Sequence, residues 1–416
     1  MTNYEFETKL IHGNEAVDDQ HGATVSPIYQ TASYAHEEPQ ELSDIFNGRQ
    51  FGYSYSRIAN PSVTALEQHV NALENGRGCV AVSSGMAAMG VICDALFQPG
   101  DHLISSNSIF GGTYYLLQEY ADNHGVAVAF VEGASTAAYE AAIQDNTKGI
   151  FVEIIGNPKC DVPHIKALSA LAKKHHIPLV VDCTATTPLL FNAKEHGVDV
   201  VWYSATKWLG GGGRSLGGLI IDCGADWKQS KSPAIQKTVK EFRQLGFLAR
   251  CRKLRSNKGA CLAPFNAFLI QIGLETLSLR LTRQCENALA LATYFDSHDE
   301  VDTVNYPGLK HCPGYKQAKA QFNVGFGGFL TIRLGSKERA FEMIRNLKLS
   351  KNLANLGDVK TIVIHPSSTI YRNLSVSEKD QAGAFDDLIR ISVGIEHIND
   401  IINDFKTALE QIKGVK

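Results

Sequence analysis

Residues 199–213 read DVVWYSATKWLGGGG, and this stretch decides how the rest of the chain is interpreted. An apolar run ends in Ser204-Ala205-Thr206-Lys207, and glycines occupy positions 210–213. A lysine at the end of a buried strand must have its charge solvated or lose it, and a desolvated amine can capture an aldehyde as a Schiff base. Because the hydroxyls of Ser204 and Thr206 could hold a phosphate beside Lys207, the stretch predicts a site for pyridoxal phosphate. The alternative is a strand-end lysine that extends into solvent.

The surrounding sequence predicts an α/β fold. Short apolar segments alternate with helical patterns, such as that of residues 164–176. This alternation is typical of a mainly parallel sheet with helices on both faces, in which ligands bind at the carboxyl ends of the strands. The segments expected to form strands are 79–85, 102–108, 149–158, 178–184, 199–207 and 217–224.

Three regions are expected along the chain. Residues 1–50 are polar and irregular, as in an N-terminal arm that reaches a neighbouring subunit. Residues 51–262 form the large cofactor-binding domain, and the basic segment 228–262 is expected to be a loop. Residues 263–416 form a smaller α+β domain with a long helix over 262–295. Strands are expected in it at 326–335, 360–366 and 388–395, and helices at 338–347 and 398–412.

The composition excludes several classes of protein. Apolar residues make up 44% of the 416 residues and the formal net charge is −3, which fits neither a disordered chain nor a nucleic-acid binder. No apolar run reaches the length of a membrane span, and the N-terminus has no signal-peptide core. Nine cysteines, an odd number without CxxC spacing, argue against a disulfide framework or a zinc site. We therefore expect a cytoplasmic protein with reduced thiols and no metal ion, with neither nucleic acid nor membrane as a partner.

Two further motifs suit the same cofactor. Asp182 ends the apolar segment PLVVD, where a carboxylate could stabilise the proton on a pyridine nitrogen so that the ring works as an electron sink. Ser84-Gly85-Met86 stands between a predicted strand and a predicted helix, so backbone N–H groups there could bind a phosphate. The alternatives are a helix cap or buried ion pair for Asp182, and an ordinary N-cap for Ser84.

Asn157 and Arg390 add polar groups at strand edges. An arginine within an apolar strand must be paired or must bind an anion, and an amino-acid carboxylate is a suitable bidentate partner. A structural salt bridge is the alternative for Arg390. The glycines at 210–213 match neither the phosphate-loop pattern nor GxGxxG, and we interpret them as room for the cofactor and the backbone.

Taken together, these residues resemble the Cys/Met-metabolism family of pyridoxal-phosphate enzymes of fold type I, which have the aspartate-aminotransferase-like fold. The similarity extends from SPIYQTASY (26–34) to the last helix. Within the family, segments 263–280, 304–309 and 354–369 are most similar to the O-acetylhomoserine sulfhydrylases. The other motifs that carry the resemblance are YSRIANPS (55–62), SSGMAA (83–88), GGTYYLL (111–117), IGNP (155–158), VVDCTATTPLL (180–190), SATKWLGG (204–211) and IRISVGIE (389–396).

The resemblance implies a role for each predicted site residue. Lys207 is implied to bind the cofactor and then to shuttle protons, Asp182 to pair with the ring nitrogen, and Phe110 to stack on the ring. Asn157 is implied to lie near the ring hydroxyl. The residues implied in phosphate binding are Gly85, Met86, Ser204 and Thr206 beside Ser84, together with Tyr55 and Arg57 of a neighbouring subunit. The residues implied in substrate binding are Arg390, Asn355 and Tyr55. The active unit is then a homo-oligomer, at least a dimer and usually a dimer of dimers.

Some positions depart from patterns usual in the family. Phe110 stands where a tyrosine is usual, so stacking is kept but the phenol that could assist the leaving group is lost. Gly112 stands where methionine lyases usually carry cysteine, and Asn355 where cystathionine enzymes usually carry serine. Both differences argue against a lyase. Arg214, directly after the glycines, is also unusual, and the sequence offers no account of it.

The expected activity is γ-replacement on O-acetyl-L-homoserine by sulfide or a thiol, giving homocysteine or methionine plus acetate. The nearest alternative is a lyase that releases a 2-oxo acid from methionine, cystathionine or homocysteine. One other class is a nicotinamide-dependent dehydrogenase, disfavoured by the missing GxGxxG and by the strand-end lysine. Another is a non-catalytic partner of a sulfur-carrier protein, with the basic stretch 228–258 as its docking surface. The sequence leaves open the sulfur donor and whether the acyl group is acetyl, succinyl or phosphoryl.

Overall fold

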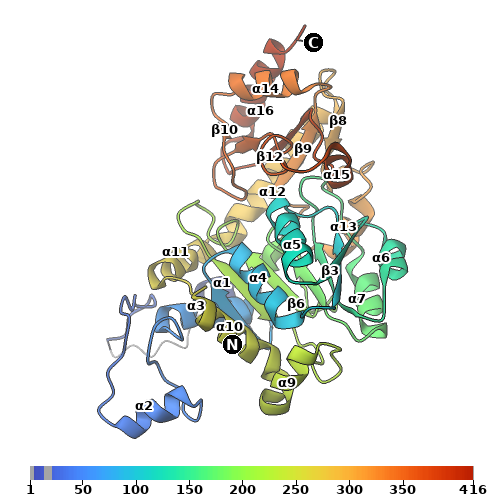
Figure 1. Ribbon diagram of the computed structural model, residues 1–416. Helices are drawn as coiled ribbons and strands as arrows, with labels where there is room; N and C mark the ends of the chain where they lie inside the picture. The colour runs from blue at the N-terminus through green and yellow to red at the C-terminus, as the bar shows by residue number, and fades with distance from the viewer. Residues whose placement is uncertain (1–3, 14–20, 416) are drawn as a thin grey trace.

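The chain folds around two sheets, and the computed structural model describes residues 4–13 and 21–415. Figure 1 shows the larger sheet in the middle of the molecule and the smaller one above it, near the C-terminus. Helices pack against both sheets. The predicted α/β class, with a mainly parallel sheet and a smaller α+β part, is confirmed.

The larger sheet has seven strands in the order β1-β7-β6-β5-β4-β2-β3. Every neighbouring pair is parallel except those of β7, which runs antiparallel to both β1 and β6. β3 is absent from the predicted strands; it lies at the edge of the sheet, and its side chains are at most half-buried. The strands are β1 (Gly78–Val82), β2 (His102–Ser106), β3 (Ala127–Val131), β4 (Thr147–Glu153), β5 (Leu179–Asp182), β6 (Val200–Ser204) and β7 (Gly218–Asp222).

Apolar side chains cover both faces of this sheet, as the continuous apolar strands predict. On β1, Val80 and Val82 belong to one apolar layer with helices α4 and α10, while Cys79 and Ala81 belong to the other with α3. The helices around the sheet are α3 (Pro61–Glu74), α4 (Gly85–Leu96), α5 (Gly111–Asn123), α6 (Thr136–Ala142), α7 (Ile165–Lys174), α8 (Thr187–Leu190), α9 (Pro233–Phe242), α10 (Gly246–Lys258) and α11 (Pro264–Glu275).

Two expectations of local structure are wrong. Residues 228–262 are not a loop, because α9, a short 3-10 turn and α10 occupy most of the segment. Its many lysines and arginines mask buried side chains at helical spacing, such as Ile235 and Val239 in α9. The long helix expected over 262–295 is two helices, α11 and α12 (Leu277–Asp296), which meet at Thr276.

The smaller sheet has the order β10-β11-β12-β9-β8, and all its pairs are antiparallel except β10 with β11. The N-terminal segment carries two short helices and is less irregular than expected. The proposed boundaries at 50 and 262 stay predictions. The remaining elements are α1 (Phe6–His12), α2 (Pro39–Phe46), β8 (Thr303–Asn305), α13 (Tyr315–Gln321), β9 (Phe329–Arg333), α14 (Lys337–Asn346), β10 (Lys351–Asn352), β11 (Ile362–Ile364), α15 (Val376–Ala382), β12 (Leu388–Ser392) and α16 (Ile398–Gln411).

Most of the cysteines lie in the hydrophobic core. All nine are free thiols and eight are buried, as expected for small apolar side chains. Within residues 4–13 and 21–415, no helix combines the length and the apolarity needed to cross a bilayer. The same residues contain no cluster of histidine, cysteine or acidic side chains arranged to hold a metal ion.

Candidate active site

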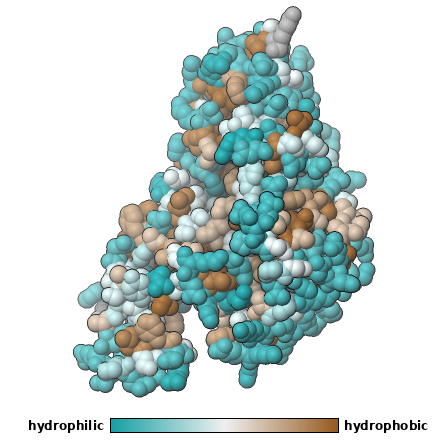
Figure 2. Space-filling model, in the orientation of Figure 1, coloured by the Kyte–Doolittle hydropathy of each residue, from teal (hydrophilic) through white to brown (hydrophobic). Residues whose placement is uncertain are grey.

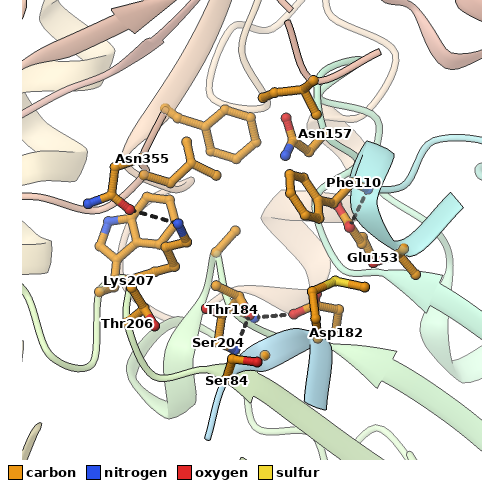
Figure 3. A pocket seen from close by; sticks show the side chains of 18 of the residues that line it. Ser84, Phe110, Glu153, Asn157, Asp182, Thr184, Ser204, Thr206, Lys207 and Asn355 are labelled. Atoms are coloured by element: carbon orange, nitrogen blue, oxygen red, sulfur yellow. Dashed lines mark hydrogen bonds between the residues drawn. The ribbon is translucent and has the colours of Figure 1, made fainter. Parts of the chain in front are cut away.

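A cavity of about 280 Å³ lies at the carboxyl ends of β4, β5 and β6, against the N-terminus of α4 and beside the smaller sheet. This is the edge at which open α/β sheets bind ligands. Figure 3 shows side chains from distant parts of the chain converging on it. The predicted residues that line it are Ser84, Gly85, Met86, Phe110, Asn157, Asp182, Ser204, Thr206, Lys207, Asn355 and Arg390.

Lys207 follows β6 and is half-buried in the wall of the cavity. Its Nζ donates a hydrogen bond of 2.7 Å to Oδ1 of Asn355. Burial, followed by the positive charge of Arg390, lowers the pKa of Lys207 to about 8. A substantial fraction of the amine is therefore neutral, and hence nucleophilic, near physiological pH.

This pKa predicts how the rate of cofactor loading depends on pH. At a pH about one unit below 8, only about one tenth of the Lys207 amine is neutral, so loading of the apoprotein with pyridoxal phosphate should be about tenfold slower there than above pH 9. The rate should rise with pH through a midpoint near 8. Stopped-flow absorbance across this range measures it. A midpoint near the ordinary value for lysine would contradict the predicted desolvation.

Asp182 ends β5 and points into the cavity, as Figure 3 shows. Its Oδ1 accepts a hydrogen bond of 2.8 Å from the backbone N–H of Thr184. Burial raises the pKa of Asp182. No lysine, arginine or histidine of the described chain forms an ion pair with it. A desolvated carboxylate without a cationic partner suits a protonated ring nitrogen, and this observation supports the cofactor interpretation.

The N-terminus of α4 and the end of β6 form a cradle for an anion. Ser84 caps α4 by accepting a hydrogen bond of 3.1 Å from Ala87 N–H. Gly85 and Met86, the first residues of the helix, line the cavity, where their backbone N–H groups can bind an anion. A Cβ on Gly85 would lie 2.7 Å from Cβ of Ser204, so only glycine allows this approach. The hydroxyl of Thr206 accepts a bond of 3.1 Å from Gly217 N–H at the rim.

Arg390 extends from β12 and is buried, with 3% of its surface exposed. Its Nη1 donates to Oδ1 of Asn157 at 3.2 Å and its Nη2 to the carbonyl of Asn355 at 3.0 Å, while its Nε has no hydrogen-bond partner among the described residues. Both partners are neutral, and no carboxylate in the described chain pairs with this guanidinium. The predicted salt-bridge alternative is therefore not found, and the arginine is available for a carboxylate ligand.

Phe110 is the residue before α5 and faces the cavity opposite Lys207 (Figure 3). Its backbone N–H donates a bond of 2.6 Å to Oε1 of Glu153. A Cβ on Gly112 would lie 2.5 Å from Cε1 of Phe110, so the glycine leaves room for the ring in this position. The ring position therefore depends on Glu153 on one side and on the missing side chain of Gly112 on the other.

Glu153 is a site residue that the sequence analysis missed. It ends β4 and is paired in register with Asp182 on β5, so two carboxyl groups stand side by side. Burial and then the charge of Asp182 raise the pKa of Glu153 well above its usual range, which favours its neutral form. The signal was present in GIFVEIIG, since an acid within an apolar strand needs an explanation.

Two substitutions of Glu153 test this protonation state. In Glu153→Gln the amide should replace a neutral carboxyl and still accept from Phe110 N–H, so kcat/KM should stay within about threefold of the wild type. Glu153→Ala should lower kcat/KM about tenfold, because a buried N–H loses its acceptor. Steady-state kinetics of both variants on one substrate measure the difference. Equal losses would show that the ionised carboxylate is required.

Tyr55 and Arg57 are not part of this cavity. Tyr55 is 42% exposed. Arg57 donates to the carbonyl of Ser256 at 2.8 Å and to its hydroxyl at 3.2 Å. Their contribution to a neighbouring subunit's site stays a proposal. The cavity also contains residues that the sequence does not single out, mostly apolar, namely Thr113, Ile155, Thr184, Ala185, Trp202, Trp208, Leu216, Phe329, Ala354, Leu356 and Ile370.

The comparisons with known proteins agree with this chemistry. A family model described as Cys/Met metabolism PLP-dependent enzyme matches residues 7–410. The chain is 38% identical to homocysteine synthase of Schizosaccharomyces pombe, over 97% of this chain and 98% of that protein. It is 36% identical to O-acetyl-L-homoserine sulfhydrylase of Leptospira meyeri, over 99% and 98% of the two chains. A Campylobacter jejuni crystal structure assigned as O-acetylhomoserine (thiol)-lyase contains N'-pyridoxyl-lysine-5'-monophosphate and has a TM-score of 0.93, with 32% identity over 98% of this chain and all of that one.

Proposed function

The chain belongs to the Cys/Met-metabolism family of pyridoxal-phosphate-dependent enzymes, and from this premise we propose that it replaces the acetyloxy group of O-acetyl-L-homoserine with sulfur. The donor is sulfide or a thiol, and the products are homocysteine or methionine with acetate. The observation that carries the proposal is the unpaired buried guanidinium of Arg390 in one cavity with the amine of Lys207 and the carboxylate of Asp182. This set binds an amino acid and moves its protons.

Each of these residues has a separate task. When bound, pyridoxal phosphate supplies an electron sink for negative charge that develops on the substrate. Asp182 would hold the ring nitrogen in its protonated form, and the cradle of α4 with Ser204 and Thr206 would bind the phosphate. Arg390 binds the substrate carboxylate and so fixes the orientation of the amino acid. Lys207 accepts and donates protons, which a pKa of about 8 permits in both directions near neutral pH.

Phe110 has no hydroxyl that could protonate a leaving group, and this favours an ester over a thioether as the substrate. Phe110, Ile155, Phe329 and Leu356 contribute apolar surface. Among the described residues that line the cavity, the ionisable side chains are those of Glu153, Asp182, Lys207 and Arg390. Acetate is a weak base and leaves with little help from an acid, whereas a thiolate needs a proton donor. The apolar wall also keeps water from the reacting carbon.

We further propose a homo-oligomer, a dimer of dimers, in which Tyr55 and Arg57 reach a neighbouring site. Large apolar side chains on the N-terminal segment support this, because Phe46 is 63% and Phe51 is 77% exposed. Figure 2 shows brown patches among the hydrophilic surface of the lower left, where Figure 1 places α2. The free thiols support the proposal of a cytoplasmic location. A sulfur-carrier protein remains an alternative donor to free sulfide.

A product assay on purified enzyme tests the function. O-acetyl-L-homoserine is supplied with and without sulfide, L-methionine is supplied separately, and homocysteine and 2-oxobutyrate are measured. We expect homocysteine that depends on sulfide, with little 2-oxobutyrate. Release of 2-oxobutyrate from methionine without any homocysteine would assign the enzyme to the lyases instead.

A further inference from the structure

A second hollow, of about 490 Å³, adjoins the cavity and contains Arg214. The two hollows share Thr206, Lys207, Leu216, Ala354 and Asn355, so the second is a vestibule of the first. In Figure 3, Thr206, Lys207 and Asn355 stand together on one side of the cavity, opposite Phe110 and Glu153. A reactant that enters on this side passes the guanidinium of Arg214 before it reaches Lys207.

The glycine run provides the seat for Arg214. A Cβ on Gly212 would lie 2.8 Å from Cζ of Arg214 and 2.9 Å from its Nη1, so any side chain at 212 would displace the guanidinium. Gly213 has a φ of +62°, the left-handed region that favours glycine. The glycines therefore have a use that their sequence pattern does not reveal: they allow the arginine to fold back over the loop.

No carboxylate of residues 4–13 and 21–415 neutralises the charge of Arg214. It is exposed, and it forms no ion pair with any carboxylate of the described chain. Asp358 approaches the same loop, where its Oδ2 would lie 2.6 Å from a Cβ on Gly213, but this carboxylate is bonded to Lys360 at 2.9 Å. The carboxylate of Asp358 is thus already paired with a lysine.

A second arginine adds to this positive charge. Arg280 of α12 is buried below the loop and donates to the backbone carbonyls of Trp208 at 2.9 Å and Gly273 at 2.6 Å, with no carboxylate partner in the described chain. Burial, and then the charge of Arg214, lowers the pKa of Arg280 to about 10. A Cβ on Gly211 would overlap the guanidinium of Arg280 and one on Gly212 that of Arg214, so the two groups lie against neighbouring residues of the loop. Arg214 and Lys207 line the vestibule without an acidic side chain among its described residues, and they give it a net positive charge.

We propose that Arg214 is an anion-recruiting residue at the entrance of the active site, which attracts a reactant that carries a negative charge on its reacting or acyl end. This rests on the proposed function and extends it to the class of the reactant. Two sources share this chemistry. One is the ionised sulfur nucleophile, hydrosulfide or a thiolate. The other is the terminal carboxylate of a dicarboxylic acyl group on homoserine.

Steady-state kinetics of the holoenzyme with Arg214→Gln test the proposal. If the anion is the nucleophile, KM for sulfide with O-acetyl-L-homoserine should rise about fivefold, with kcat at saturating sulfide little changed, and the difference from wild type should shrink as salt is added. If the anion is the acyl carboxylate, the ratio of kcat/KM for O-succinyl- over O-acetyl-L-homoserine should fall by a similar factor. Either result supports the anion site and identifies its source.

Two further variants control for other effects. Gly212→Ala keeps the charge but displaces the guanidinium, and we expect it to reproduce the change seen in Arg214→Gln. Arg345→Gln removes an exposed arginine from α14 and should leave both quantities at the wild-type value. The proposal is overturned if Arg214→Gln leaves both the sulfide KM and the acyl ratio unchanged, or if Arg345→Gln alters them equally.

A binding measurement separates this proposal from the proposed function. Sulfate is titrated into the wild type and Arg214→Gln while the fluorescence of tryptophan is followed, since Trp208 lines the cavity. Weaker sulfate binding by the variant supports the anion site even in an enzyme that makes no homocysteine. Equal sulfate binding by the two proteins rejects the anion site whether or not the proposed function holds.

Discussion

Replacing Lys207 with alanine should reduce homocysteine formation by at least about 10⁴-fold, the largest effect that we expect from any single substitution. The reason is that Lys207 provides the cavity's amine, half-buried and held at 2.7 Å from Oδ1 of Asn355. No other lysine lines the cavity or its vestibule in the described chain. No neighbouring group can therefore bind the cofactor covalently or carry the substrate proton in its place.

Lys207→Arg is the matched control for charge. A guanidinium keeps the positive charge and fills similar space, but it is not deprotonated near neutral pH and is a poor nucleophile. If Lys207 acts through its neutral amine, both variants should be inactive and should lose the absorbance band of the lysine-bound cofactor. Addition of a small primary amine should restore part of the activity of Lys207→Ala. Substantial turnover by Lys207→Arg would mean that the charge, not the amine, is needed.

Substitution of Asp182 with asparagine should lower kcat about 10³-fold, which corresponds to about 4 kcal/mol in the barrier. Asparagine has nearly the same shape and can still accept the hydrogen bond of 2.8 Å from Thr184 N–H, so the variant removes the negative charge and little else. Without that charge, nothing in this part of the cavity favours a protonated ring nitrogen, and the ring becomes a weaker electron sink. Asp182→Ala should be impaired at least as strongly.

Glu153→Gln is the natural comparison, because Glu153 and Asp182 are neighbours in register on adjacent strands. We expect the same chemical change to have a large effect at Asp182 and a small one at Glu153, since only Asp182 is required as a carboxylate. The measurement is kcat with O-acetyl-L-homoserine and sulfide, with cofactor content determined by absorbance. Comparable losses in the two variants would show that the charge is shared by the pair rather than held by Asp182.

The sequence locates the site residues at the strand ends well, because ligands of open α/β sheets bind at the carboxyl ends of the strands. Lys207 and Ser84 follow apolar strands and Asp182 ends one, and the carboxyl ends of such strands meet at one edge of the sheet. The sequence also points to Arg390, because a charged residue within the apolar segment LIRISVG requires a partner. For these residues, the local cost of burying polar groups already indicates a ligand.

Other features depend on contacts that a sequence does not contain. The helices α9 and α10 were not predicted because lysines and arginines are as numerous in them as the buried residues that define their inner faces. Glu153 is conspicuous in the sequence as an acid within an apolar strand, but its place beside Asp182 follows only from the register of β4 and β5. The role proposed for Arg214 depends on the folded chain, because only the structure shows that no carboxylate of the described residues pairs with its guanidinium. The apolar residues of the cavity walls come from distant parts of the chain, so no short sequence motif identifies them together.

The burial of the cysteines has a consequence for an enzyme that works among reactive sulfur compounds. Eight thiols are buried, and burial raises the pKa of thiols such as Cys79, Cys93 and Cys183. Exchange reactions proceed through an accessible thiolate, which these side chains do not offer. The chain also has no disulfide that sulfide could cleave, because all nine cysteines are free. Apart from Cys261, which is half-buried, the thiols are thus shielded from the sulfur reagents that the active site is proposed to consume.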